Sequence, residues 1–263
     1  MIEFDKNGFI MESKFFDKTI TKSIKDDIFC VFHNIFNKNN QSQKHNKIKS
    51  IDQLVEEIYL NDYQSFLGAI RACQNLLSLV RLSTEEKIQM MLKDIGLTKP
   101  IQSTPPMLMI NSPKLSKIDS HHRTPPHQDW RSIQGSLDSI VVWIPLIDVD
   151  HDLGALKIVP SSHSNGLKKS VKDEWFRKLK HPPDDNQFID VEMNEGDVLF
   201  FSTFLIHKSG NITSDKMRWS VQFRYNNLDE ESFIMNRYPN PYQIKVNDQI
   251  INQEFFELIN EPE

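Results

Sequence analysis

The chain has 263 residues, of which 38% are hydrophobic and 25% charged, with a formal net charge of −5 and a pI near 6.0. This composition can bury a core and argues against global disorder. Lys and Arg are scattered, which argues against nucleic-acid binding, because that needs a concentrated basic face. No apolar run approaches the roughly 20 residues that cross a membrane, and no signal peptide is evident. With Cys30 and Cys73 expected to be reduced thiols, we expect a cytoplasmic protein.

The first 100 residues predict a mainly helical region. Apolar side chains recur at helical spacing there, and Ser23 with Asp26 and Ser50 with Gln53 fit capping boxes at the starts of helices. A polar stretch rich in Asn, Lys and Gln predicts a surface loop between these two starts. In chain order the predicted segments are a strand over 4–11, helices over 23–36, 50–58, 66–80 and 83–95, and the loop over 37–49.

After residue 99, proline clusters and short β-rich runs replace the helical period. Short strands separated by turn residues are typical of an antiparallel sandwich or barrel. We therefore expect one domain over residues 1–263, with a helical flank (1–100), a double-stranded β core (101–227) and a C-terminal tail (228–263). The predicted strands are 107–110, 139–144, 155–159, 188–193, 198–202 and 219–225, with a short helix over 175–180.

The segment Pro-Pro-His-Gln-Asp-Trp at residues 125–130 carries the strongest chemical signal. On a strand, residues i and i+2 point to the same face, so His127 and Asp129 can converge on one point. An imidazole and a carboxylate supply two of the three ligands of a facial 2-His-1-carboxylate site. The alternative is a solvated His and Asp in a loop, because His-x-Asp by itself is common.

Two later residues extend this pattern. His207 follows an apolar run and precedes a turn, so it is placed to be a third ligand, although a lone histidine there is more often structural. Arg218 has alternating apolar neighbours, which predicts that it points inward. A buried guanidinium costs several kcal/mol unless it is paired, and no nearby acid is its obvious partner. A dicarboxylate co-substrate could supply the missing charge; the alternative is an exposed arginine on an edge strand.

The stretch from residue 107 to 225 resembles the phytanoyl-CoA dioxygenase family of iron and 2-oxoglutarate oxygenases. His127-Gln128-Asp129 looks like the metal motif of the family, and Arg218 stands eleven residues after His207, as is usual there. Further similar segments are His207-Lys208-Ser209-Gly210, Gly154-Ala155-Leu156, Glu195-Gly196-Asp197 and Pro160-Ser161-Ser162-His163, in which Ser161 replaces a family glycine and is expected to alter a turn.

The resemblance implies a double-stranded β-helix core, which is a cupin-like jelly roll, and an enzyme that uses Fe(II), 2-oxoglutarate and O2. It implies that His127, Asp129 and His207 bind the iron. Arg218 and Ser209 are then expected to hold the distal carboxylate of 2-oxoglutarate, in a pocket that Trp143 lines. Oxidative decarboxylation to succinate and CO2 accompanies oxidation of a substrate C–H bond in this family. We therefore expect a dioxygenase that hydroxylates a small-molecule metabolite.

Two rival functions remain open. The first is a cupin-type iron oxygenase that does not use 2-oxoglutarate, against which Arg218 and Ser209 argue. The second is a catalytically silent jelly-roll binding protein, against which the intact ligand set argues. Within the family, epimerisation, desaturation or ring formation can replace hydroxylation, whereas halogenases have a small residue where Asp129 stands here. The sequence leaves the substrate and the oligomeric state open.

Overall fold

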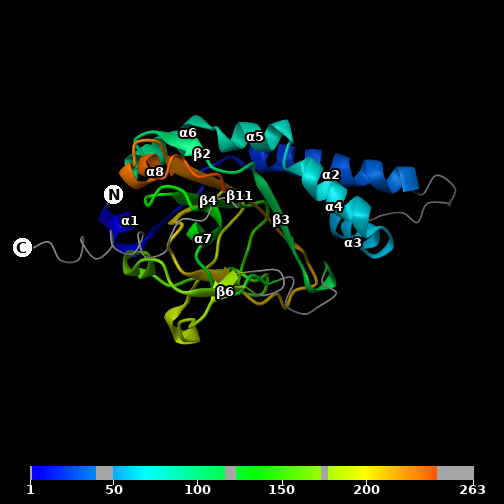
Figure 1. Ribbon diagram of the computed structural model, residues 1–263. Helices are drawn as coiled ribbons and strands as arrows, with labels where there is room; N and C mark the ends of the chain where they lie inside the picture. Colours follow the sequence, from blue (N-terminus) through cyan, green and yellow to red (C-terminus); the bar gives the residue numbers. More distant parts are fainter. Residues whose placement is uncertain (1, 40–49, 116–122, 173–176, 242–263) are drawn as a thin grey trace, which may run out of the picture.

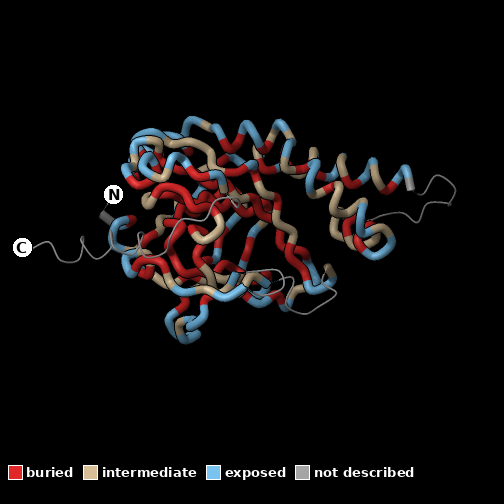
Figure 2. Tube along the Cα trace, viewed as in Figure 1, coloured by how far each residue is buried: buried red, intermediate tan, exposed pale blue. Residues whose placement is uncertain are grey.

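The helices between residues 18 and 94 lie along one side of a β structure (Figure 1). The computed structural model describes residues 2–39, 50–115, 123–172 and 177–241. Most of the predicted tail and most of the predicted loop over 37–49 lie outside these residues. Figure 2 shows that the buried stretches concentrate in the strands and on the helical surfaces that face them.

The predicted helical region forms a layer in which α2 packs on α3, α4 and α5. The α2 residues Ile24, Ile28 and Phe32 are all buried, as their spacing predicted. Ser50 caps α3, because its hydroxyl accepts a hydrogen bond from the Gln53 N–H at 3.3 Å. Among the described residues, no helix is long and apolar enough to cross a membrane. The helices are α1 (Ile2–Asn7), α2 (Lys18–Asn39), α3 (Ile51–Asn61), α4 (Tyr63–Cys73), α5 (Leu77–Ser83), α6 (Glu86–Asp94), α7 (Trp130–Ile133) and α8 (Glu231–Met235).

Three boundaries in this region differ from the prediction. The segment before Gly8 is the helix α1 and not a strand, and the chain turns at Gly8, whose φ is +78°. Helix α2 begins at Lys18, ahead of the predicted start at Ser23. The single helix predicted over residues 66–80 is divided into α4 and α5. Leu77, at the start of α5, is 68% exposed and does not continue the buried face of α4.

The major sheet is antiparallel and has six strands in the order β1-β9-β4-β11-β2, with β3 beside the first half of β11. On the long central strand, Gln222 lies opposite Met107 of β3 and Trp143 of β4. The strands are β1 (Phe9–Glu12), β2 (Pro100–Gln102), β3 (Met107–Asn111), β4 (Ile140–Pro145), β9 (Val198–Ser202) and β11 (Arg218–Asn227).

A three-stranded sheet, β10-β5-β8, forms the other layer, and β6 pairs with β7 in a separate hairpin. The predicted helix over 175–180 is wrong for residues 177–179, which form β7. Leu179 explains the difference, since it is buried and its N–H donates to the Pro126 carbonyl at 2.8 Å. These strands are β5 (Leu156–Ile158), β6 (Ser170–Lys172), β7 (Arg177–Leu179), β8 (Ile189–Val191) and β10 (His207–Ser209).

Strand β11 separates two apolar layers. Its side chains alternate between the faces of the sheet, as in any strand. Trp219, Phe223 and Tyr225 belong to the large core shared with the helices. A second cluster, which includes Trp143 and Leu156, fills part of the space between the two sheets. The even-numbered residues of β11 point to that second side, where the candidate site lies.

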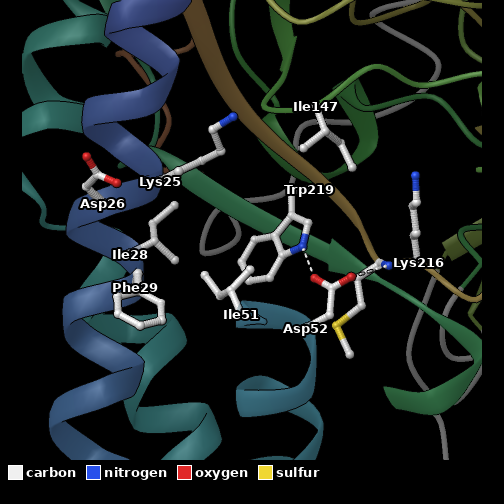
Figure 3. Close-up of a pocket in the computed structure, with 10 residues that line it drawn as sticks. Lys25, Asp26, Ile28, Phe29, Ile51, Asp52, Ile147, Lys216 and Trp219 are labelled. Atoms are coloured by element: carbon white, nitrogen blue, oxygen red, sulfur yellow. Dashed lines mark hydrogen bonds between the residues drawn. The ribbon is translucent and has the colours of Figure 1, made fainter. Parts of the chain in front are cut away.

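A half-buried acid attaches the helical layer to β11 (Figure 3). The carboxylate of Asp52, in α3, accepts hydrogen bonds from the Trp219 indole N–H at 2.8 Å and from the Met217 N–H at 3.0 Å. Ile28 and Phe29 of α2 line the same hollow of about 340 Å³. The helices are therefore held to the strand immediately beside Arg218.

Ser161, which stands where the family has glycine, adopts a left-handed backbone conformation with a φ of +63°. Its N–H donates to the Asn7 carbonyl and its hydroxyl to the Lys6 carbonyl, each at 2.8 Å. These bonds hold the turn against the end of α1, in a conformation that costs a non-glycine residue about 1–2 kcal/mol.

Candidate metal centre

The structure brings His127, Asp129 and His207 together. One ligand atom from each lies within 4.8 Å of the others. The two histidines face each other across an isolated antiparallel bridge, in which each N–H donates to the other's carbonyl at 3.0 and 3.1 Å. Their ring centroids are 4.1 Å apart. The backbone thus places two imidazoles side by side at the junction of two distant segments.

Asp129 reaches the same point by a different route from the predicted strand. It is the residue before α7, with φ −67° and ψ −30°, so it has helical backbone geometry. The expectation that His127 and Asp129 alternate along one strand is therefore wrong, although their convergence is as predicted. The turn into α7 directs the Asp129 carboxylate toward His127, so that its Oδ1 lies 3.2 Å from the His127 Nε2.

Backbone carbonyls determine which ring nitrogen of each histidine carries hydrogen. The Nδ1 atoms of His127 and His207 lie 2.8 and 3.0 Å from the carbonyls of Pro125 and Leu205, which can only accept. Each Nδ1 therefore carries hydrogen, and in a neutral ring Nε2 presents its lone pair. A neutral His127 would present its Nε2 lone pair to the Asp129 carboxylate, and a metal ion between the two would be bound by both. Two ligands at right angles, each about 2.1 Å from an ion, are about 3 Å apart, close to the observed separation.

The charges around Asp129 favour its ionised form. Burial alone would raise the pKa of this carboxyl, but the Arg224 guanidinium and the two facing histidines outweigh burial and hold the pKa well below its usual range. Arg224 Nε and Nη2 both lie 3.0 Å from Asp129 Oδ2. The site thus offers one permanently charged carboxylate.

The His207 imidazole is neutral at physiological pH. Burial, together with the charge of the neighbouring His127, lowers the pKa of His207 to about 3. Two imidazoles and one carboxylate of this kind form the donor set of a facial 2-His-1-carboxylate iron site, which leaves further coordination positions open.

The three residues line a cavity of about 200 Å³ between the two sheets. The predicted co-substrate residues Arg218, Ser209 and Trp143 line it as well, so the structure brings all six predicted site residues to one cavity. The other lining residues are Met107, Met109, Asn111, Thr124, Gln128, Ser132, Leu156, Arg177, Gln222 and Arg224.

Arg218 is buried, as its apolar neighbours predicted, with 3% of its surface exposed. Its Nη2 donates to the Ser209 hydroxyl at 3.3 Å, and its Nη1 donates to the Gly154 carbonyl. Its Nε is buried and has no hydrogen-bond partner among the described residues. Burial lowers the pKa of this guanidinium to about 10. A buried cation whose described partners are both neutral is suited to bind an anionic group.

Sequence reasoning missed Arg224 and Gln222. Both lie on the cavity face of β11, and the Gln222 Oε1 accepts a hydrogen bond from Arg224 Nη2 at 3.1 Å. The signal was present, because residues 218, 222 and 224 share one face once β11 is extended as a continuous strand. Arg224 could not be distinguished from an ordinary surface arginine, because nothing in the sequence places it near Asp129, 95 positions earlier.

The profile of the phytanoyl-CoA dioxygenase (PhyH) family matches residues 4–220. The chain therefore belongs to the phytanoyl-CoA dioxygenase family, as its motifs indicated. The match begins within α1 and so includes the helical layer as well as the β core.

Curated relatives match a shorter stretch. The 1-deoxypentalenic acid 11-beta-hydroxylase of Streptomyces exfoliatus is 34% identical over 113 residues, which is 38% of this chain and 40% of that protein. The peroxisomal phytanoyl-CoA dioxygenase of Rattus norvegicus is 26% identical over 132 residues, which is 47% of this chain and 38% of that protein. The match thus spans less than half the length of either relative.

Among solved structures, the chain is similar to the epimerase SnoN in complex with Fe3+, alpha ketoglutarate and nogalamycin RO. The TM-score is 0.58 at 15% sequence identity, over 86% of this chain and 81% of SnoN. At this identity the likeness concerns the fold, which is the predicted jelly roll with a helical N-terminal region.

Proposed function

We propose that this protein is a non-haem Fe(II) and 2-oxoglutarate-dependent dioxygenase that hydroxylates a small-molecule metabolite. One observation carries the proposal. A His-Asp-His cluster and a buried arginine whose described hydrogen-bond acceptors are both neutral line the same cavity. The first suits Fe(II), and the second suits the far carboxylate of a dicarboxylate co-substrate.

His127, Asp129 and His207 would hold the iron in this proposal. Two imidazole lone pairs and one charged carboxylate are the donor set that the metal requires, and the 3.2 Å between His127 Nε2 and Asp129 Oδ1 suits two ligands of one ion. Arg218 and Ser209 would bind the distal carboxylate of 2-oxoglutarate, which supplies the missing acceptor for Arg218 Nε.

Together with O2, these groups supply oxidative decarboxylation to succinate and oxidation of a nearby C–H bond. The chain itself orients and encloses the reactants. Ser209 follows His207 by two residues on β10, so the metal ligand and the proposed co-substrate ligand lie on one face of that strand. Trp143 is 1% exposed and closes the cavity on the side of the major sheet, which helps to exclude water.

Hydroxylation is proposed over the other outcomes of the family on two grounds. Asp129 occupies the position that a halide would need, and the relative at 34% identity is named a hydroxylase. The structural neighbour SnoN is an epimerase, so this fold alone does not select one outcome.

The test is succinate release from 2-oxoglutarate under aerobic conditions, with Fe(II) and fractionated metabolite pools. We expect succinate formation that depends on one fraction and a product heavier by one oxygen. The variant Arg218→Leu separates co-substrate binding from metal binding, because it should lose turnover at limiting 2-oxoglutarate while it still binds the metal. Oxygen consumption without succinate would support the cupin-type alternative, and failure of the wild type to bind Fe(II) or Mn(II) would support a silent binding protein.

We further propose that the helical layer and the β core form one domain, because a single cluster of buried residues includes Ile28 and Phe32 from α2 together with Val221 and Phe223 from β11. One cooperative transition in chemical unfolding, seen alike by far-UV dichroism and by tryptophan fluorescence, is expected. Two separate transitions would contradict it.

A cytoplasmic location is also proposed. Cys30 is exposed and Cys73 is buried, and both are free thiols, which reducing compartments maintain. Recovery of the protein from a periplasmic or extracellular fraction of its native cells would contradict this location.

A further inference from the structure

Arg224 makes an unusual contact with the candidate metal ligand Asp129. An arginine fork commonly engages both oxygens of a carboxylate, one with each nitrogen. Here Nε and Nη2 converge on the single oxygen Oδ2, each at 3.0 Å. The second oxygen, Oδ1, is left to face the His127 Nε2 at 3.2 Å. The two oxygens of one carboxylate are thus assigned to different partners.

The guanidinium is itself held firmly in place. Arg224 is 7% exposed and lies opposite Val141 on the central strand of the major sheet. Its Nη2 also donates to Gln222 Oε1, and its Nη1 contacts the Met107 sulfur. A guanidinium has no acceptor atom, so the amide oxygen of Gln222 must face it. Backbone pairing and side-chain contacts together restrict the position of both nitrogens that reach Asp129.

We propose that Arg224 is a positioning residue that makes Asp129 bind the metal through Oδ1 alone. This inference rests on the proposed function, since it concerns the same iron site. A carboxylate that chelates with both oxygens would occupy one more coordination position, and the reaction needs three positions for 2-oxoglutarate and O2. By retaining Oδ2, Arg224 keeps the third position open and fixes the direction of Oδ1. Arg224 touches the ligand and not the metal.

This role differs from that of Arg218, although both arginines come from β11. Six residues separate them on the same face, which is about 20 Å of extended strand. Arg218 contacts Ser209 and Gly154 and has no described carboxylate partner, whereas Arg224 contacts Asp129. One arginine is left for the co-substrate, and the other is engaged with the metal ligand.

The test measures Mn(II) affinity by calorimetry in wild type, Arg224→Met and Arg224→Lys. Loss of a residue that orients a metal ligand typically weakens metal binding 10- to 100-fold, and we expect that range for Arg224→Met. Arg224→Lys keeps the charge but not the planar fork, so an intermediate affinity is expected. Arg177→Met is the matched control, because it removes a guanidinium from the rim of the same cavity without touching Asp129; its affinity should stay within about threefold of wild type.

The visible spectrum of the Co(II)-substituted proteins gives a second readout. A change in coordination in Arg224→Met, with far-UV dichroism unchanged, is expected from a carboxylate that is free to chelate. Wild-type Mn(II) affinity in folded Arg224→Met would overturn the inference. If that variant does not fold, wild-type affinity in Arg224→Lys would overturn it equally. Absence of metal binding in the wild type would overturn the proposed function as well. Failure of the proposed function can therefore be told apart from failure of the inference about Arg224 alone.

Discussion

Arg218→Met tests whether the buried guanidinium is kept for binding rather than for stability. Burial lowers the Arg218 pKa to about 10, which corresponds to about 3 kcal/mol of unfavourable desolvation. This penalty is fully present below about pH 10, where the group is charged in both the folded and the unfolded chain, and it fades as the pH rises further. Hydrogen bonds from a charged donor contribute at least about 1.5 kcal/mol each, so the bonds to Ser209 and Gly154 roughly cancel this penalty.

The net expectation is that Arg218→Met changes the stability of the protein free of metal and co-substrate by no more than about 1 kcal/mol, which shifts Tm by at most roughly 2–4 °C for a chain of this size. The same variant should bind 2-oxoglutarate far more weakly. Loss of a buried, hydrogen-bonded charge pair costs about 2–5 kcal/mol, and the middle of that range, about 3.5 kcal/mol, is roughly a 300-fold increase in Kd.

Both quantities can be measured on one preparation by differential scanning fluorimetry without ligands and by calorimetric titration of 2-oxoglutarate in the presence of Mn(II). Arg123→Met is the control, because Arg123 is exposed and bonded only to Asn211 in the described structure; it should change stability by less than about 0.5 kcal/mol. A Tm of the free Arg218→Met protein that falls by more than roughly 4 °C, or an unchanged affinity for 2-oxoglutarate, would refute the reasoning.

Three further predictions concern other parts of the molecule. Asp129→Ala removes the only carboxylate of the three ligands, so Mn(II) affinity measured by calorimetry should fall by more than about 100-fold; near wild-type binding would contradict the ligand assignment. Asp52→Ala leaves the buried Trp219 indole N–H without its acceptor, so urea unfolding should show a loss of about 2–3 kcal/mol, and an unchanged midpoint would count against this attachment. Iodoacetamide at neutral pH should label Cys30 only, since Cys73 is buried and burial raises the pKa of its thiol to about 12; two adducts on the folded protein by mass spectrometry would show that Cys73 is accessible.

The sequence could predict much of the β core, because its strands are apolar runs between turn residues. Five of the named strands, β3, β4, β5, β8 and β9, fall within or beside the predicted ranges, and β11 extends the last of them. The convergence of His127, Asp129 and His207 was also expected, because the motifs around these residues resemble those of a family in which such residues bind one metal. Arg218 could be placed inward because its neighbours alternate.

Tertiary pairing decided what the sequence could not show. Strand β10 has only three residues, and it forms because His207 pairs with Ile158 and Ser209 with Leu156. Three residues are too few to show the alternating pattern that predicts a strand. Asp129 enters a turn because α7 begins directly after it, although its spacing from His127 suits a strand equally well. The role of Arg224 depends on a contact between two segments far apart in the chain, which neither segment encodes alone.

The alternating faces of β11 have a consequence for how this chain folds. A slip of one residue in its pairing would exchange the two faces. Arg218 and Arg224 would then enter the apolar layer beneath the helices, and Trp219 and Phe223 would fill the cavity. Two unpaired charges in an apolar core cost more than the whole stability of a typical domain. A chain in the shifted register is therefore far less stable than the native one. The two arginines that line the site thus also select the native register of β11.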